Sequence, residues 1–371
     1  MNVYRIAPAF ALCGSVPVFV RERLKSLLFS FFRKVVHHDN GRRAICAALP
    51  GGIACLPRLP SRPRLTPPYP ELPGLESATQ TISPPIFITA RFRSGSTLLW
   101  NIFRQFAGVT SYYEPLNERR WFDPSTCGSR VDATHRNVAE YWKEYAGLEC
   151  LSACYRESWI DHDLYMDERW WNPGLKRYIQ ILIERAAGRA VLQFNRVDFR
   201  LAWLRNHFPE ARLVHLFRNP RDQWCSTLVD PGCFGPRGQI ADFEPFDGYY
   251  LLRWCRDLKY MFPFLDPQSV THPYELFYFV WKLSYLYGTS YAHCSLAFEQ
   301  LVADPKEVLS RLLDQVHLMG VDLAPALAII EPPEMGKWKH YADAAWFQDI
   351  ELKCEQTLAD FLPNGPAGVL A

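Results

Sequence analysis

The chain has 371 residues, of which 49% are hydrophobic and 22% are charged, and its formal net charge is +2 at neutral pH. This amount of apolar side chain is enough for one large core, or for a core with an appendage. The small net charge gives no reason to expect a nucleic-acid partner, and any basic character should be local to a binding groove.

Residues 1–55 are predicted to form an N-terminal extension. Residues 7–20 are apolar, but they include two prolines and are fewer than the roughly 20 residues that cross a bilayer. Residues 21–36 set leucines and phenylalanines against arginines and lysines, as in an amphipathic helix. We expect this helix either to contact a membrane peripherally or to dock on the rest of the chain. No signal peptide is predicted, because no small-residue cleavage site follows a clean apolar region.

Residues 56–82 are predicted to be a linker, because seven prolines fall within residues 56–74. The remaining sequence predicts one large α/β domain over residues 83–362 and a short C-terminal tail over residues 363–371. No internal repeat is present.

A strand, a turn and a helix are predicted at the start of this domain. Residues 86–90 are a short β-branched run, which suits a buried strand of a parallel sheet, and residues 97–106 have helical apolar spacing. The turn between them reads Arg-Ser-Gly-Ser-Thr over residues 93–97. Unpaired N–H groups at a helix start favour the binding of an anion. Gly95 allows the backbone to come close to a ligand, and the Arg93 guanidinium can donate hydrogen bonds to phosphate or sulfate oxygens.

This turn differs from the phosphate loop of nucleotide-hydrolysing enzymes. That motif needs a lysine after its second glycine, and Ser96 occupies the corresponding place. A simpler interpretation is an ordinary polar helix start with Ser94 as the N-cap.

A second turn of the same kind follows a predicted β-α-β unit. Residues 191–194 and 213–217 are apolar strand-like runs, and residues 199–208 between them have helical spacing. Arg218 comes at the carboxyl end of the second strand, where open α/β sheets bind ligands. Ser226 follows eight residues later, about two helical turns, so both side chains can reach one groove.

The two turns together resemble the sulfotransferases that use 3′-phosphoadenosine-5′-phosphosulfate, most nearly the carbohydrate-type or bacterial branch. Residues 93–97 match the phosphosulfate loop of that family, and residues 218–226 match its Arg-Asn-Pro-Lys/Arg-Asp signature with a serine eight after the arginine. The resemblance implies a three-layer α/β/α fold, similar to P-loop NTPases, with a mostly parallel central sheet. It also implies an enzyme that releases adenosine 3′,5′-bisphosphate.

The resemblance implies a set of cofactor-binding residues. Residues 336–341 resemble a late Gly-x-Trp-Lys/Arg segment of the family, although a basic surface turn would read the same way. Residues 296–305 resemble a structural strand and turn. The implied cofactor contacts come from the two signatures and the late segment: Arg93, Ser94, Gly95, Ser96, Thr97, Leu98, Arg218, Ser226, Lys337 and Trp338.

Sulfuryl transfer to a hydroxyl requires a base and donors that hold charge on the leaving group. Arg93 is expected to supply the donors that hold charge on the leaving group. Glu114 opens a Glu-Pro-Leu stretch that resembles the carbohydrate-type branch, and it is the preferred base, although an ion pair with Arg119 is the alternative. The small-phenol branch uses a histidine where residues 195–198 stand, and none is present, so Asp198 is the reserve base. Asn195 or Arg196 is expected at the transferred group.

No metal site is predicted, because residues 161–163 read Asp-His-Asp without a second ligand cluster at a suitable spacing. The eleven cysteines contain no C-x-x-C pair. They are interpreted as buried thiols of a reducing, cytoplasmic location.

The acceptor is the least determined feature of the sequence. Aromatic residues are frequent in residues 121–189 and 243–291, where they form either an acceptor platform or a core. We expect sulfation of a carbohydrate or glycolipid hydroxyl, with tyrosine or a small-molecule hydroxyl second. A nucleotide-dependent kinase or ATPase and a non-catalytic nucleotide-binding relative are the alternatives from other classes. The sequence does not determine the oligomeric state.

Overall fold

The structure is a computed structural model and describes residues 83–128, 131–132, 135–228, 232, 234–331 and 333–362. These residues belong to one compact unit, Pro73–Ala371. The predicted N-terminal extension with its amphipathic helix, the proline-rich linker and the C-terminal tail lie outside the described residues. Within the described part of the chain, no helix is both long and apolar enough to span a membrane.

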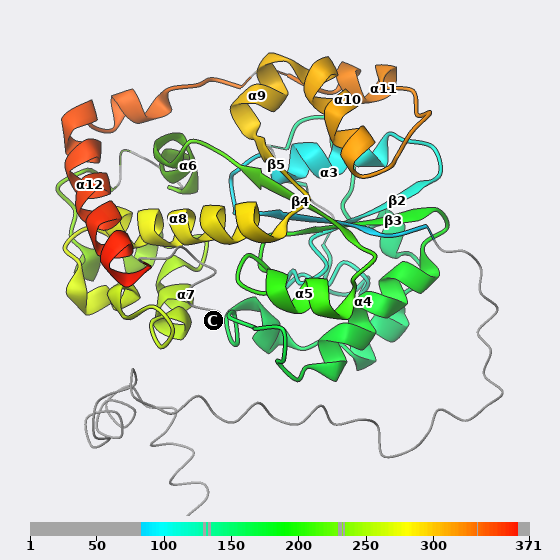
Figure 1. Cartoon of the computed structure of the whole chain (residues 1–371), viewed down its shortest axis with the longest axis horizontal. Coiled ribbons are helices and arrows are strands. Elements are labelled where there is room, and N and C mark those ends of the chain that lie inside the picture. The colour runs from blue at the N-terminus through cyan, green and yellow to red at the C-terminus, as the bar shows by residue number, and fades with distance from the viewer. Residues whose placement is uncertain are drawn as a thin grey trace, which may run out of the picture. The chain divides into compact units, whose positions relative to one another are not determined.

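A five-stranded, all-parallel sheet forms the centre of the described domain (Figure 1). The strand order is β2-β3-β1-β4-β5. This confirms the predicted α/β fold class with its mostly parallel central sheet. The strands are β1 Ile86–Ala90, β2 Val109–Tyr113, β3 Arg189–Phe194, β4 Arg212–Phe217 and β5 Cys294–Ala297.

Strand β1 lies at the middle of the sheet and is buried along its whole length. Ile86 is in register with Val191 of β3 on one side and with Arg212 of β4 on the other. Since both faces of such a strand are covered, its sequence is continuously apolar or β-branched rather than alternating. The short run that the sequence predicts as a strand therefore matches the observed bounds of β1.

Helices cover both faces of the sheet (Figure 1). Alternate residues of β1 point to opposite faces, so Ile86 and Ile88 join one core and Phe87 joins the other. The core with Ile86 includes side chains of α3 Ser96–Arg104, α9 Phe298–Ala303, α10 Pro305–Gln315 and α11 Ala324–Ala328. The core with Phe87 includes side chains of α4 Pro173–Arg185, α5 Leu201–His207, α7 Leu251–Leu258, α8 Pro273–Tyr291 and α12 Ala344–Phe361.

The helix starts that flank the sheet are fixed by local capping. Asn219 accepts hydrogen bonds from two N–H groups of α6 Pro220–Thr227, and proline occupies the first helical position, where its missing N–H costs nothing. Helix α8 begins with a capping box between His272 and Glu275. The single-turn 3₁₀ helices are η4 Lys143–Tyr145, η5 Glu149–Ala153, η6 Glu157–Ile160, η7 Ile240–Asp242, η8 Glu244–Phe246, η9 Pro263–Leu265, η10 Pro267–Ser269 and η11 Lys337–His340.

The interpretation of Ser94 as a helix N-cap is wrong. The N-cap of α3 is Gly95, in the left-handed region at φ 92°, and no side chain caps the helix. The Ser94 hydroxyl instead donates to the carbonyl of Arg91 at 2.6 Å. The first N–H groups of α3 are therefore not capped by a side chain, which is the condition that an anion site needs.

The aromatic stretch over residues 121–189 mostly packs into the core. Its buried aromatic residues share the core that contains Phe87, and they are Trp121, Phe122, Tyr141, Tyr145, Tyr155, Trp159 and Tyr178. Trp170 and Trp171 are exceptions, with 39% and 65% of their surfaces exposed. Most of these rings are thus structural, and few are left for an acceptor platform.

Candidate active site

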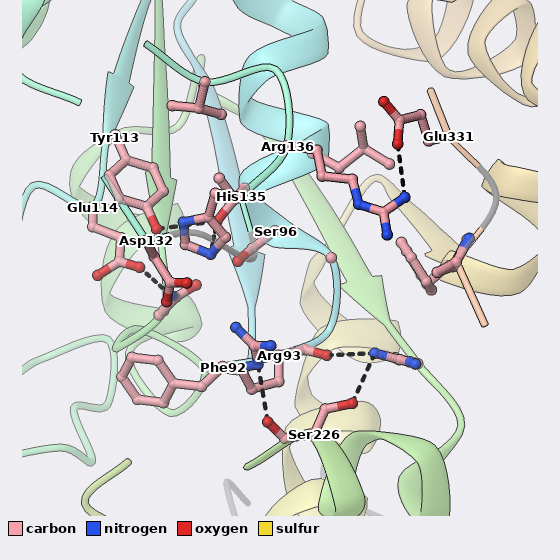
Figure 2. A pocket seen from close by; sticks show the side chains of 18 of the residues that line it. Phe92, Arg93, Ser96, Tyr113, Glu114, Asp132, His135, Arg136, Ser226 and Glu331 are labelled. Atoms are coloured by element: carbon pink, nitrogen blue, oxygen red, sulfur yellow. Dashed lines mark hydrogen bonds and ion pairs between the residues drawn. The ribbon is translucent and has the colours of Figure 1, made fainter. Parts of the chain in front are cut away.

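A cavity of about 530 Å³ opens at the carboxyl ends of the strands (Figure 2). Each of the five strands delivers a residue to its wall just after the strand ends, as expected for an open α/β sheet. These residues are Phe92, Glu114, Asn195, Arg218 and Phe298. The predicted site residues that line the same cavity are Arg93, Gly95, Ser96, Thr97, Leu98, Glu114, Arg218, Ser226 and Lys337.

The two signature turns contact each other, although 125 residues separate Arg93 from Arg218 (Figure 2). The Arg218 guanidinium donates to the carbonyl of Arg93 at 3.2 Å and to the hydroxyl of Ser226 at 3.3 Å. The Arg93 side chain donates to the carbonyl of Ser226 at 3.0 Å. The structure therefore brings the predicted basic and hydroxyl groups to one side of one cavity.

The turn before α3 is held in a conformation that glycine favours. Gly95 has φ 92°, and a Cβ atom built on it would lie 2.2 Å from the ring of Phe298. A side chain at this position would therefore clash with Phe298, so only glycine lets the backbone of the turn lie this close to the ring. Ser94 is fully buried and does not line the cavity, so its contribution is limited to its backbone and to the bond with Arg91.

Arg218 is a buried cation with unused hydrogen-bonding capacity. Its side chain lies over the Phe298 ring at 5.1 Å, and burial lowers its pKa from the usual arginine value. Its Nε atom is buried and has no hydrogen-bond partner within the described residues. Because an unmatched buried donor is costly, this geometry favours an anionic ligand next to Arg218.

The late segment is joined to α6 by a carboxylate. Asp222 accepts from the N–H of Gly336 at 2.9 Å, which brings Lys337 to the cavity wall, where it pairs with Glu334 at 3.8 Å. Trp338 does not line the cavity; its ring faces the guanidinium of Arg221 at 5.0 Å. The structure thus separates these two predicted cofactor contacts.

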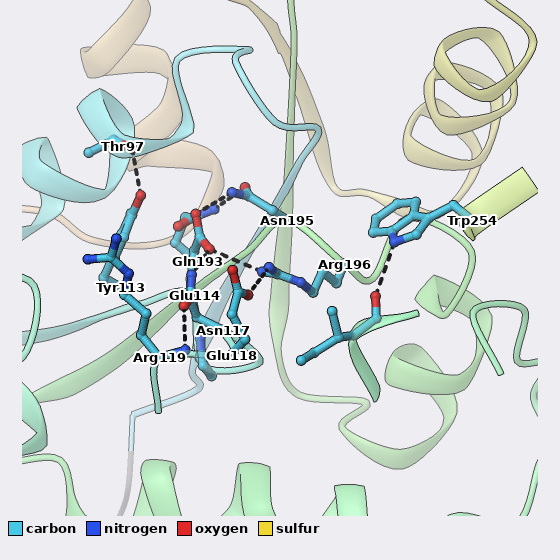
Figure 3. A network of polar contacts seen from close by, with 12 residues as sticks. Thr97, Tyr113, Glu114, Asn117, Glu118, Arg119, Gln193, Asn195, Arg196 and Trp254 are labelled. Carbon is cyan, nitrogen blue, oxygen red and sulfur yellow. Dashed lines mark hydrogen bonds and ion pairs between the residues drawn. The ribbon is translucent and has the colours of Figure 1, made fainter. Parts of the chain in front are cut away.

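Glu114 lines the same cavity as Arg218, is 6% exposed and accepts several hydrogen bonds (Figure 3). One carboxylate oxygen accepts from the side-chain amide of Asn195, and the other accepts from Asn117 at 2.6 Å and from Arg196 at 3.1 Å. The contact that the sequence suggested with Arg119 is not the one formed. Three donors from two segments fix the orientation of this carboxylate.

The two residues after β3 that were expected near the transferred group have different surroundings. Asn195 lines the cavity and accepts from Gln193 at 2.6 Å while it donates to Glu114. Arg196 is buried between Glu114 and Glu118 and lies over the ring of Phe92 at 5.0 Å. The charge of Arg196 is therefore matched by two carboxylates, and the residue holds Glu114 in place at the cavity wall.

Asp198, the reserve base, is buried outside the cavity. It accepts from the hydroxyl of Thr89 at 2.7 Å and faces Arg91 at 3.6 Å. Burial raises the pKa of this carboxyl above the usual aspartate value. Asp198 therefore does not line the cavity, and its contacts are those of a structural residue.

His135 lines the cavity and was missed by the sequence reasoning. Its Nε2 atom lies 3.3 Å from the hydroxyl of Thr97, and burial lowers its pKa, which favours the neutral ring. The residue belongs to an irregular segment far from both signatures, where no local motif marks it. Its proximity to Thr97 is created by the fold.

The comparison with protein families identifies the family of the chain. The sequence profile of the sulfotransferase family matches residues 84–322, which is more than half of the chain. The chain belongs to the sulfotransferase family.

Solved structures of bacterial sulfotransferases are also similar to this sulfotransferase. One from Mycobacterium avium is 14% identical with a TM-score of 0.38, and the match covers 77% of each chain. One from Mycobacterium tuberculosis H37Rv is 16% identical with a TM-score of 0.38, covering 73% of this chain and 77% of that one. One from Alicyclobacillus acidocaldarius is 12% identical with a TM-score of 0.35, covering 78% and 99%. No curated protein matches the sequence.

Family membership makes the sulfotransferase an enzyme that depends on 3′-phosphoadenosine-5′-phosphosulfate. The residues present fit such an anion: a buried guanidinium with an unmatched Nε, a helix start without a side-chain cap, and two arginines on one wall. In the described ranges, no group of three or more His, Cys, Asp or Glu side chains is arranged to hold a metal ion.

Proposed function

We propose that the sulfotransferase transfers a sulfuryl group to a hydroxyl of a carbohydrate or glycolipid, with Glu114 as the base. The observation that carries this proposal is that one cavity is lined both by Glu114 and by the candidate anion-binding residues Arg93, Arg218 and Ser226. In-line displacement needs a proton acceptor opposite the leaving group, and Glu114 would be that acceptor for a leaving group bound by Arg93.

The anion-binding wall would hold the cofactor. When bound, 3′-phosphoadenosine-5′-phosphosulfate supplies the activated sulfuryl group. The N–H groups of α3 and the guanidinium of Arg93 would bind the phosphosulfate, while Arg218 and Ser226 would bind the 3′-phosphate. Lys337 lies at the rim of the same wall and would add positive charge near the departing phosphate.

Glu114 would receive the proton of the acceptor hydroxyl at a carboxylate oxygen. Asn195, Asn117 and Arg196 hold both oxygens, so the carboxylate is oriented before an acceptor arrives. Such orientation is what a general base requires, because a misplaced carboxylate loses most of its effect.

The lining of the Glu114 side of the cavity supports an uncharged acceptor. Aromatic rings of Phe92, Tyr113 and Tyr249 offer apolar faces to a sugar ring. Arg196, which supports this side, already has its charge matched by Glu114 and Glu118. A tyrosine or small-molecule hydroxyl is the second candidate acceptor, since the same rings would pack against a phenol.

The role of Glu114 is tested by Glu114→Gln. This variant should bind adenosine 3′,5′-bisphosphate with affinity within about twofold of wild type, while turnover with a hydroxyl acceptor falls at least about 100-fold. Calorimetry measures the first quantity, and transfer of labelled sulfuryl to a panel of sugars, glycolipids and phenols measures the second. Glu118→Gln, which alters the neighbouring exposed carboxylate, is the matched control. Unchanged turnover in Glu114→Gln would remove Glu114 as the base.

A further inference from the structure

Two adjacent residues of α6 hold the late segment that carries Lys337 and Trp338. The Asp222 carboxylate accepts from the N–H of Gly336 at 2.9 Å through one oxygen and from the N–H of Trp338 at 3.4 Å through the other. The guanidinium of Arg221 lies over the Trp338 ring at 5.0 Å. The backbone and the ring of the late segment therefore both contact α6, although 114 residues separate Asp222 from Gly336.

The Asp222 carboxylate is buried, with only 3% of the residue exposed. Gly336 has φ 78°, a left-handed conformation that glycine favours, and the N–H groups of residues 336 and 338 both reach this one carboxylate. A buried carboxylate is costly unless it is hydrogen bonded, so these two bonds offset the cost of burying it. The turn over residues 336–338 is therefore shaped around Asp222.

Arg221 fixes Trp338 of the same turn. Its guanidinium donates to both carboxylate oxygens of Glu351 on α12, at 2.8 and 2.7 Å, and lies over the Trp338 ring. The Trp338 ring also meets Phe347 of α12 edge to face, with ring centroids 5.7 Å apart. Trp338 is thus packed against α12, while its neighbour Lys337 lines the cavity.

The charge of Asp222 is unfavourable for a residue beside an anion site. Burial lowers the pKa of Arg218, and the Asp222 carboxylate opposes this lowering, so the two groups interact electrostatically. A negative charge at this place repels a bisphosphate, and by electrostatics alone its removal should strengthen nucleotide binding. Any loss of affinity on removing this charge must then come from the turn that the carboxylate holds.

We propose that Asp222 is a positioning residue for the cofactor, because its two hydrogen bonds to the late segment present Lys337 to the nucleotide cavity. The inference rests on the proposed cofactor-binding role of Arg218 and Lys337. Trp338 is then the anchor of the turn, which explains why its ring packs on α12 although its neighbour in the sequence lines the cavity.

Hydrogen exchange of the full chain without nucleotide tests the contact itself. In Asp222→Asn, an amide NH₂ group replaces one of the two accepting oxygens, so peptides that cover residues 336–341 should exchange at least about tenfold faster than in wild type. Peptides from α8 should be unchanged. Asp343→Asn, which alters the N-cap of α12, is the matched control and should leave residues 336–341 protected. Wild-type exchange in Asp222→Asn would overturn the proposal.

Affinity for adenosine 3′,5′-bisphosphate is the second test, and the direction of its change is decisive. Asp222→Asn should weaken binding about fivefold, whereas electrostatics alone predicts tighter binding. Calorimetry measures the dissociation constant and the stoichiometry together, and loss of folded protein would change only the stoichiometry. Unchanged or tighter binding would overturn the proposal.

Glu334→Gln is the matched control for this measurement. It removes a carboxylate charge 3.8 Å from the Lys337 amine and leaves the two backbone hydrogen bonds to Asp222 in place. This variant should bind the bisphosphate as tightly as wild type or more tightly. A loss equal to that of Asp222→Asn would assign the effect to charge and contradict the proposal.

Coupling between Asp222 and Lys337 is the third test. Lys337→Ala should weaken binding of the bisphosphate about fivefold in the wild-type background and less than about twofold in the Asp222→Asn background, because the lysine is then no longer held at the cavity. Equal losses in the two backgrounds, or no loss in either, would contradict the proposal. These measurements need no acceptor, so failure here is distinct from failure of the proposed function, which the turnover of Glu114→Gln decides.

Discussion

Arg218 and Arg93 define the site at the scale of single residues. One guanidinium is buried against Phe298 with a donor unmatched, and the other is bound to the carbonyl of Ser226. A bisphosphate that engages both should gain from charge-assisted hydrogen bonds in a partly dry cavity. A triphosphate without a 3′-phosphate lacks the group that Arg218 and Ser226 would bind.

Removing Arg218 should therefore remove the preference for a 3′-phosphate. We expect Arg218→Ala to weaken binding of adenosine 3′,5′-bisphosphate at least about tenfold and to leave the weak binding of ATP nearly unchanged. Calorimetry with both nucleotides measures this, with Arg177→Ala on the exposed surface of α4 as the control. Equal affinity of the wild type for the two nucleotides would contradict the assigned role.

The site residues that belong to a local sequence pattern could be predicted from the sequence. Arg93, Gly95 and Arg218 follow buried strands, so their place at one sheet edge follows from topology. His135 was not predictable, because it lies in an irregular segment and the Thr97 that it contacts is 38 residues away in the sequence. An aspartate is a residue type that can act as a base, but the fold buries Asp198 against Arg91.

Close packing between elements places the sheet and its helices. Helix α8 crosses β4 at Gly288, where a Cβ atom would lie 2.4 Å from the ring of His215. Gly288→Ala should lower the free energy of unfolding by about 1–3 kcal/mol, because overpacking exceeds the gain in helix propensity. Chemical denaturation measures this. Gly235→Ala is the control, since nothing lies within 4 Å of its built Cβ, and an equal loss there would contradict the explanation.

Strands β1, β3 and β4 were predicted within two residues of their ends, whereas β2 was not predicted and the helix starts were less certain. Strand runs are short and apolar, so burial on both faces defines them in the sequence. The start of α3 was assigned to a serine cap, whereas the conformation of Gly95 is set by Phe298, more than 200 residues away. No propensity of the local sequence carries that information.

Acid sensitivity is a property of the whole folded molecule. Burial lowers the pKa of His215 to about 4, so between its ordinary value of 6.5 and about 4 the unfolded chain binds a proton that the folded chain does not. The contribution of His215 to stability is therefore present at neutral pH and is lost as the pH falls through this window.

The difference in unfolding free energy between pH 7 and pH 5 should shrink by about 2 kcal/mol in His215→Gln relative to wild type. Denaturant unfolding at the two pH values measures this slope. His340→Gln, at an exposed position, should retain the wild-type slope. An unaltered slope in His215→Gln would show that His215 does not carry the effect.

At the scale of the molecule, the order of the predicted elements indicated the fold class, and the resemblance of the two signature turns indicated the family. They did not separate core rings from site rings, because Tyr141 and Tyr178 have the same sequence signature as Tyr113, yet only Tyr113 of the three lines the cavity within the described residues. The acceptor depends on that distinction, which is why it remains a proposal.

The hydrogen bonds between the two signature turns have one further consequence. Arg218 already donates to the Arg93 carbonyl and the Ser226 hydroxyl, so the two turns are held together by hydrogen bonds without a nucleotide. When the nucleotide binds, the arginine exchanges hydrogen bonds within the protein for hydrogen bonds to the ligand. Little additional backbone of the turns then has to be immobilised. Diffusional encounter, rather than ordering of a loop, should set how quickly the nucleotide is taken up.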